Sequence, residues 1–442
     1  MNYRLSPYGC ASVAPAPVNR MMAAFATDFR DGVDINLGVG YVNEKTIPSA
    51  LLVEATRRVA EQPERYRQAF NYGGPHGSPN LAQAIRRFYS ERVIGGLDAC
   101  ALDQCELVVG PSGATSILEA LADLFAPGIV VTADPMYYIY CNHLERKGFE
   151  VLTVPEDCDG LNADAVESRL DALGDRAHEL AFLYVVTVNN PSGVILSNPR
   201  RHALARLAER WSRRLGRALP IFFDQAYEWL IHDPEIPRPE SALMNNDAGL
   251  VYEIGTLSKI IAPTLRIGFI LGRPGPLMRA IVQKTSDVGF SAPLLNQEVA
   301  AYMLEHHMDA QLQQVNAGYR EKAQHVRQAI DATLSPWLED CRGGQGGFYF
   351  YLTFKQLRTD TASPFFHFLS RATGNPEIDG PSDNRFPRVV YLPGEFCVHP
   401  EGASAERGRR QLRLSYGFED LDTITHALQH MHDAAQFAQM RC

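Results

Sequence analysis

The sequence has no apolar segment long enough to cross a membrane. Its longest unbroken apolar run, from Leu180 to Val186, is of strand length, whereas a membrane-spanning helix needs about 20 apolar residues. The chain also lacks a basic excess, because 42 Lys and Arg residues stand against 51 Asp and Glu residues, a formal net charge of −9. Nucleic-acid-binding domains normally carry clustered positive charge. We therefore expect neither a membrane nor a nucleic acid among its partners.

The cysteines lack the spacing of a metal site or of a disulfide framework. Eight of them are spread from Cys10 to Cys442, no CxxC motif occurs, and Cys100 and Cys105 have no His pair nearby. Disulfide frameworks belong mostly to small secreted chains. No apolar block follows the early Arg4, as it would in a secretory signal. These features predict free thiols, no bound metal and a cytoplasmic location.

Short apolar runs alternate with amphipathic segments between residues 106 and 272 of the 442. The runs are unbroken, as in strands covered on both faces, and strand–helix alternation is typical of an α/β fold with a mostly parallel sheet. Near residue 310 a long helical segment precedes three further apolar runs. We therefore predict a large α/β domain at 46–309, with that sheet flanked by helices, and a smaller α+β domain at 310–442.

Two segments have a different composition from these domains. Residues 1–45 include Pro7, Pro15 and Pro17 and show no clear periodicity, which predicts an irregular, extended N-terminal arm. Residues 371–388 are polar and rich in proline and glycine, which predicts a surface loop.

Polar residues follow four of the predicted strands. Ser112 precedes a helix whose N-terminus favours an anion, while Asn190, Asp224 and Lys259 each follow another strand. Taken singly, these residues have ordinary explanations: a helix cap, a turn, a paired acid and a surface lysine. However, the 34 residues from Asn190 to Asp224 and the 35 from Asp224 to Lys259 each match one strand plus its connection, so all can face one crevice at the carboxyl ends of the strands. An amine, a carboxylate and an anion cradle form the set that pyridoxal phosphate requires.

These residues also carry a family resemblance. The segments NNPSG, FFDQAY, GTLSKIIAPTLRIGF and LRLSYG resemble, in this order, the fold-type I pyridoxal-phosphate-dependent aminotransferases of class I/II, and the resemblance covers nearly the whole chain. TLSKIIAPTLRIGF is similar to the 2-aminoadipate and broad-specificity aromatic aminotransferase branch. The resemblance implies that Lys259 forms the internal aldimine and that Asp224 pairs with the pyridinium nitrogen. It also implies that Asn190 and Tyr227 bond the 3-oxygen of the ring.

The resemblance implies roles for further residues at the cofactor. It implies that Tyr137, which adjoins Tyr138, stacks on the ring of the cofactor. It also implies that Tyr72 reaches the phosphate of a neighbouring subunit, and hence a homodimer with shared active sites. The implied phosphate cradle consists of Ser112, Gly113, Ala114, Thr256, Ser258 and Arg266.

Substrate binding is implied in the same way. Arg413 is implied to grip the substrate α-carboxylate through its bidentate fork, with Asn190 and Gly38 beside it. Gly38 lies in the arm, which is implied to contribute to the small domain and to the entrance of the active site.

The implied reaction moves an amino group from an L-amino acid to a 2-oxoacid by a ping-pong mechanism through a Lys259 aldimine, with Lys259, Asp224 and Tyr227 as catalytic residues. A pyridoxal-phosphate-dependent lyase, cyclase or oxidase of amino acid metabolism is the alternative, since one scaffold hosts many reactions. A sensor domain of a transcription regulator is less favoured, because no helix-turn-helix pattern precedes residue 45. These residues do not determine which amino acid is the substrate. Gln225 stands at a position where the resembled family commonly has an acidic residue. The candidate residues of the substrate pocket are Arg20, Arg30, Tyr41 and His76.

Overall fold

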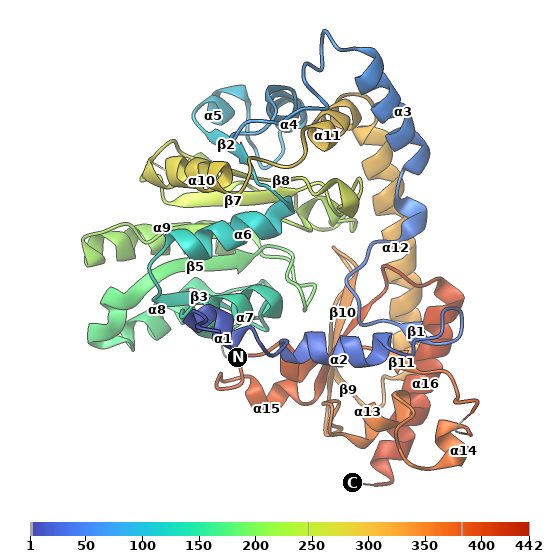
Figure 1. Cartoon of the computed structure of the whole chain (residues 1–442). Helices are drawn as coiled ribbons and strands as arrows, with labels where there is room; N and C mark the ends of the chain where they lie inside the picture. The colour runs from blue at the N-terminus through green and yellow to red at the C-terminus, as the bar shows by residue number, and fades with distance from the viewer. Residues whose placement is uncertain (1–2, 246, 382, 442) are drawn as a thin grey trace.

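A seven-stranded sheet lies at the centre of the larger part of the computed structural model, which describes residues 3–245, 247–381 and 383–441 (Figure 1). Its strands run parallel to one another except β8, which pairs antiparallel with both of its neighbours. The predicted mostly parallel sheet is therefore confirmed. In spatial order the strands are β2 (Glu106–Val109), β8 (Gly268–Gly272), β7 (Val251–Thr256), β6 (Ile221–Asp224), β5 (Leu180–Val186), β3 (Ile129–Asp134) and β4 (Glu150–Pro155).

Both faces of this sheet are buried. Successive residues of β6 show this, because Phe222 packs into one hydrophobic cluster and Phe223 into another. Strands enclosed in this way need apolar side chains at every position, which explains the unbroken apolar runs. The helices of this part of the chain are α3 (Ser49–Glu61), α4 (Pro79–Arg92), α5 (Ala99–Asp103), α6 (Gly113–Leu124), α7 (Tyr138–Arg146), α8 (Ala163–Asp171), α9 (Asn198–Leu215), α10 (Pro276–Asp287) and α11 (Leu294–His306).

A second, antiparallel sheet follows the long helix α12 (Met308–Thr333), as predicted for the C-terminal part (Figure 1). Its edge strand β9 (Leu338–Gly343) was not predicted, because its sequence LEDCRG is polar and partly exposed. The other strands are β10 (Tyr349–Phe354), β13 (Gln411–Ser415) and β12 (Leu392–Pro393), and the helices are α13 (Pro364–Leu369), α14 (Pro376–Asp379), α15 (Ala405–Gly408) and α16 (Leu421–Gln439). Short 3-10 turns lie at Glu44–Thr46, Gly174–Glu179, Glu228–Leu230, Ala242–Asn245, Pro263–Leu265 and Gly394–Phe396.

The N-terminal arm is not irregular, and this prediction was wrong. It contains helices α1 (Pro7–Ala11) and α2 (Pro17–Ala26), and each begins with a proline. Proline is tolerated in the first turn of a helix, because its missing N–H has no partner there, so these prolines start helices rather than prevent them. The arm then forms β1 (Ile35–Asn36), which pairs in parallel with β11 (Val389–Val390).

The 371–388 loop is anchored at both ends by buried arginines. Arg371 donates to Pro387 O at 2.9 Å, and Arg388 pairs with Asp34 of the arm at 2.9 Å. Between these ends most residues lie at the surface, as predicted, and helix α14 was not predicted. Ser382 lies outside the described residues. Across the described residues no helix is both long and apolar enough to cross a membrane.

Candidate active site

One pocket at the carboxyl ends of β5, β6 and β7 gathers most of the predicted site residues. Its volume is about 130 Å³. Parallel strands place their C-terminal ends along one edge of the sheet, which is where open α/β sheets bind ligands. The predicted residues that line it are Ala114, Tyr137, Asn190, Asp224, Tyr227, Thr256, Ser258, Lys259 and Arg266.

Lys259 follows β7 and points its amine into this pocket. Its Nζ lies 3.4 Å from Gly40 O and 5.3 Å from the centre of the Tyr227 ring. Burial, together with the nearby charge of Arg413, lowers the pKa of Lys259 to about 8, and Asp224 opposes the shift. A lysine with such a pKa is partly neutral near pH 7 and can act as a nucleophile.

Asp224 is the last residue of β6 and is buried. Tyr184 Oη donates to Asp224 Oδ2 at 2.8 Å, and the backbone N–H of Ala226 donates to Oδ1 at 3.0 Å. Burial raises the pKa of Asp224, while the hydrogen bond from Tyr184 and the charge of Lys259 act in the opposite direction. The carboxylate is thus held in one orientation and is suited to a cationic partner in the pocket.

The start of helix α6 and Arg266 form a positively polarised corner of the pocket. Ser112, the N-cap residue, makes no side-chain capping hydrogen bond, so the N–H groups of the first turn are not satisfied by it. Arg266 donates from Nε to Ser112 Oγ at 3.2 Å and adopts a left-handed backbone conformation, with φ of 54°. Gly113 has φ of 66°, and a Cβ there would lie 3.1 Å from the Arg266 guanidinium. This corner is suited to an anion such as phosphate.

Arg413 approaches the pocket from β13 of the small sheet. Its guanidinium donates to Asn190 Oδ1 at 2.7 Å and to Gly38 O at 2.5 Å, and it lies 4.4 Å above the Tyr349 ring. Its Nε has no hydrogen-bond partner among the described residues. A buried guanidinium with an unused donor is suited to a carboxylate ligand.

The structure separates the two adjacent tyrosines. Tyr137 lines the pocket, and burial raises its pKa. Tyr138 instead packs in a cluster that includes Phe25 of the arm and Tyr351 and Leu392 of the small sheet. Tyr137 is therefore the one of the two that can contact a ligand in the pocket.

A sequence model of the family described as aminotransferase class I and II matches residues 33–372. The chain belongs to this family.

The individual relatives include aminotransferases and transcriptional regulators. An aromatic-amino-acid aminotransferase of Thermococcus litoralis is 25% identical over 323 residues, 72% of this chain and 73% of its own length. A transcriptional regulator of the HTH type from Bacillus subtilis, YisV, is 23% identical over 412 residues, 92% of this chain and 74% of its own length. The crystal structure of a multiple substrate aminotransferase from Thermococcus profundus superposes with a TM-score of 0.83 at 20% identity, covering 99% of this chain and 98% of that one.

The predictions of an aminotransferase and of its cofactor are thus confirmed at the level of the family. Class I and II aminotransferases use pyridoxal 5′-phosphate. The pocket of this aminotransferase fits that group chemically, because it places a positively polarised corner, a buried carboxylate and a lysine amine around one space.

Some predicted residues do not reach the pocket within this aminotransferase chain. Tyr72 is 80% exposed and packs edge-on against Phe290 at the surface. Arg30 forms a salt bridge with Asp34 at 2.8 Å, so it stabilises the contact between the arm and the 371–388 loop. Arg20, Tyr41 and His76 are exposed, and Gln225 is buried without lining the pocket.

Two tyrosines at the site were missed by the sequence analysis. Tyr184 is the only hydroxyl-bearing residue of the run LAFLYVV, and a buried tyrosine usually finds a hydrogen-bond partner, so this signal was available. Tyr349, whose Oη lies 2.9 Å from Tyr227 Oη, gave no comparable signal. Its hydrogen-bond partner Tyr227 lies 122 residues away in the sequence.

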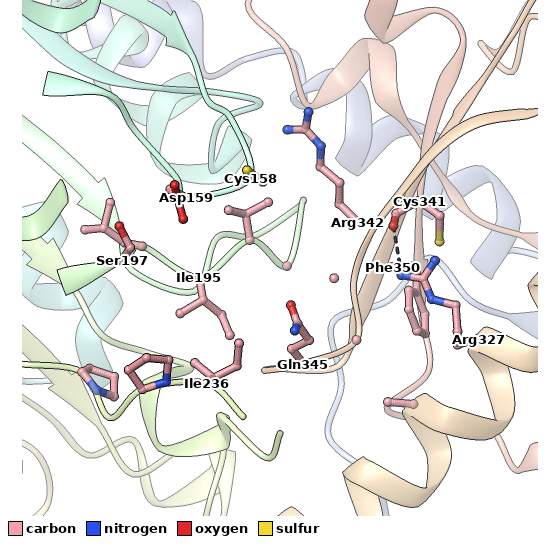
Figure 2. A pocket seen from close by; sticks show the side chains of 18 of the residues that line it. Cys158, Asp159, Ile195, Ser197, Ile236, Arg327, Cys341, Arg342, Gln345 and Phe350 are labelled. Carbon is pink, nitrogen blue, oxygen red and sulfur yellow. Dashed lines mark hydrogen bonds between the residues drawn. The ribbon is translucent and has the colours of Figure 1, made fainter. Parts of the chain in front are cut away.

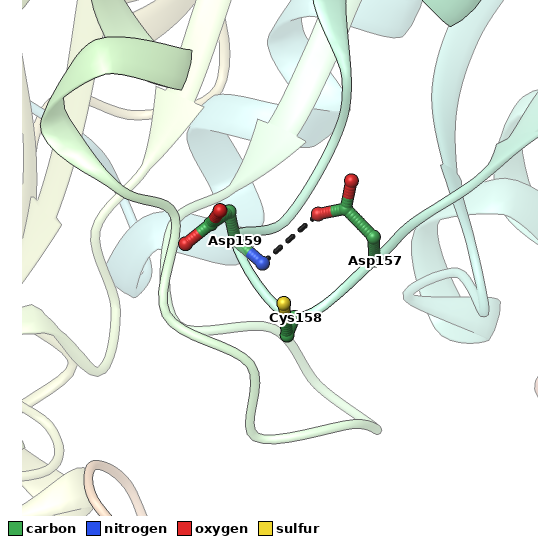
Figure 3. Close-up of side chains that lie close together, drawn as sticks. All are labelled: Asp157, Cys158 and Asp159. Carbon is green, nitrogen blue, oxygen red and sulfur yellow. Dashed lines mark hydrogen bonds between the residues drawn. The ribbon is translucent and has the colours of Figure 1, made fainter.

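A larger cavity of about 800 Å³ lies between the large sheet and the small sheet (Figure 2). Ile195 and Ser197 face it from one side and Cys341 and Arg342 of β9 from the other. Next to it, Asp157, Cys158 and Asp159 form a turn whose side chains lie close together (Figure 3). Asp157 already pairs with Arg200 at 2.6 Å, and such an exposed turn does not by itself indicate a metal site.

Proposed function

We propose that this aminotransferase moves an amino group from an L-amino acid to a 2-oxoacid in two half-reactions of a ping-pong cycle, with pyridoxal 5′-phosphate attached at Lys259. The observation that carries the proposal is that Lys259 and Asp224 line one pocket, and that Arg413 from a third element bonds Asn190 of the same pocket. The three groups have different roles, because the amine can attach the cofactor and move a proton, the carboxylate can hold a cation, and the guanidinium can hold a carboxylate.

The cofactor, when bound, supplies an aldehyde that carries the amino group and a conjugated ring that accepts electrons from Cα. Asp224 holds the proton on the ring nitrogen, because Tyr184 and the Ala226 N–H already orient its carboxylate. Lys259, with a pKa of about 8, exists in both protonation states near neutral pH. It therefore both takes a proton from Cα of the amino acid and returns one.

Asn190 and Tyr227 hold the 3-oxygen of the ring. The Asn190 Oδ1 already accepts from Arg413, so its Nδ2 group is the part left to donate to that oxygen. Tyr137 covers one face of the ring. Arg266, the α6 N-terminus at Ser112, Gly113 and Ala114, and the hydroxyls of Thr256 and Ser258 hold the phosphate.

Arg413 holds the α-carboxylate of the substrate by a two-pronged, charge-assisted contact. Asn190 fixes the guanidinium from one side and Gly38 O from the other. Because Gly38 belongs to the arm, the arm forms part of the wall of the substrate site.

The proposed assembly is a homodimer with shared sites, located in the cytoplasm. Tyr72 and Phe290 expose aromatic surface beside a shallow hollow, and Tyr72 would reach the phosphate in the partner subunit. Tyr72→Phe is expected to weaken cofactor binding about 10- to 100-fold, as one hydrogen bond to a charged group is lost. Mixing inactive Lys259→Ala subunits with inactive subunits that lack the Tyr72 loop should restore activity, and no recovery after verified subunit exchange would contradict shared sites. The free cysteines are compatible with a reducing compartment.

The reaction itself is tested in half-reactions with a panel of L-amino acids. Enzyme loaded with the cofactor is mixed with one amino acid and no acceptor, and the released oxoacid is counted. We expect one oxoacid per site, and a further turnover only after a second oxoacid is added. Release of ammonia, hydrogen peroxide or a sulfur compound without an acceptor would instead identify a lyase, cyclase or oxidase.

A further inference from the structure

We propose that Tyr349 is a positioning residue for the cofactor, whose hydroxyl donates to Tyr227 and so makes Tyr227 a stronger donor to the 3-oxygen of the ring. This inference rests on the proposed function. It concerns a residue for which the sequence indicated no role.

Tyr349 occupies an enclosed position at the start of β10. It is 1% exposed, and its ring packs at 68° against that of Tyr227, with 5.6 Å between the ring centres. The two hydroxyl oxygens lie 2.9 Å apart, a normal hydrogen-bond distance. A Cβ added to Gly40 would lie 2.6 Å from Tyr349 Oη, so the backbone of the arm closes directly over this hydroxyl and keeps it from water.

The direction of this hydrogen bond follows from counting hydrogens. Burial raises the pKa of both tyrosines, so each keeps its single hydroxyl hydrogen near neutral pH. If Tyr227 gives its hydrogen to the 3-oxygen, its own oxygen can only accept from Tyr349. Tyr349 is then the donor, and a donor in a chain of hydrogen bonds strengthens the next bond along it.

Arg413 is placed to reinforce this chain. Its guanidinium carbon lies 4.4 Å from the centre of the Tyr349 ring. A cation over a phenol favours its ionised form, which makes the hydroxyl a better donor. Tyr349 thus contacts both the residue proposed to hold the substrate and the residue proposed to hold the cofactor oxygen.

The test is the pH titration of the absorbance of the bound cofactor in Tyr349→Phe. This substitution removes one oxygen and keeps the ring beneath Arg413. A weaker donor at Tyr227 stabilises the ionised 3-oxygen less, so the midpoint of the titration is expected to rise by about half to one pH unit. Tyr391→Phe is the matched control, because it removes another buried hydroxyl, one bonded to Thr359 O. It is expected to leave the midpoint unchanged.

Repeating the Tyr349→Phe substitution in a Tyr227→Phe protein distinguishes an effect through Tyr227 from a general structural effect. In Tyr227→Phe protein the Tyr349→Phe substitution is expected to shift nothing further, because the residue through which it acts is gone. An unchanged midpoint in the single variant, or equal shifts in both backgrounds, would overturn the proposal. If Tyr349→Phe does not fold, Gly40→Ala displaces the hydroxyl instead and is expected to shift the midpoint in the same direction, and no shift there would count equally against it. A native protein that takes up no cofactor would refute the proposed function as well, whereas cofactor uptake without these shifts would refute only this inference.

Discussion

The two cavities described above differ in size and in the state of their charged groups. Asn190 lines the smaller and Gly193 the larger, so one short segment separates them. In the larger cavity Arg342 pairs with Asp340 at 2.7 Å, and Arg327 donates to Cys341 O at 2.9 Å. At the smaller one, among the described residues, Lys259 Nζ has a 3.4 Å contact to Gly40 O but no ion pair, and the Nε of the nearby Arg413 has no hydrogen-bond partner. Unpaired, enclosed charge therefore marks a site better than volume does.

The strongest test of this difference replaces Lys259. Lys259→Ala should lower the transamination rate by at least about 10⁴-fold, because both the attachment point and the proton carrier are lost. Lys322→Met is the control, since burial also lowers the pKa of Lys322 to about 8 but its amine donates to Gly417 O and Glu419 O away from the pocket. Borohydride reduction of the loaded enzyme should label Lys259. A label on Lys322 would reverse the assignment.

The next test compares one acid from each cavity. Asp224→Ala should reduce the half-reaction rate by about 10³- to 10⁵-fold, or ~4–7 kcal/mol, because no carboxylate then holds the proton of the ring nitrogen. Asp340→Ala in the larger cavity should change this rate by less than about threefold. Single-turnover absorbance measures both. Near-native rates in Asp224→Ala would remove Asp224 from its proposed role.

A smaller effect is expected for the arginines. Arg413→Lys keeps the charge but loses the fork, so KM for the amino acid should rise about 10- to 100-fold, with the absorbance of the bound cofactor unchanged. Arg342→Lys makes the same exchange in the larger cavity and should leave KM within a small factor. Equal effects of the two substitutions would show that the larger cavity also takes part in substrate binding.

The mildest test is the pH dependence of cofactor capture by the apoprotein. Lys259 must be neutral to attack the aldehyde, and its pKa is lowered to about 8. The capture rate should therefore rise with pH, about eightfold from pH 6.5 to 7.5, and level off above about pH 9. In Asp224→Ala the midpoint should move to lower pH, because the carboxylate that favours the charged amine is absent. A rate that still climbs steeply at pH 9.5 would indicate an ordinary lysine.

The sequence predicted the large sheet well, because strands such as β5 and β6 are buried on both faces and therefore apolar, apart from Asp224 where β6 ends. It did not predict β9, whose polar residues lie at an exposed edge, nor α1 and α2, whose prolines stand at helix starts. In these elements the local sequence, which is polar or contains proline, indicates a loop, whereas the folded chain forms a strand or a helix there.

The site was predictable where its residues follow strands of one sheet. Lys259 and Asp224 meet because neighbouring parallel strands end together. Tyr349 could not be predicted, because it reaches Tyr227 only when the small sheet packs against the large one, 122 residues further along the chain.

The pairing of β1 with β11 has a consequence for synthesis on the ribosome. Ile35 pairs with Val389, and Gly38 O accepts from Arg413, which is made 375 residues later. The large sheet, whose strands end at residue 272, can form while the chain is still emerging. The proposed substrate clamp cannot, because long-range contacts form only after both partners are available. On the proposed roles, we expect a nascent chain to acquire its cofactor pocket before it can hold an amino acid, and to become competent only when its two ends meet.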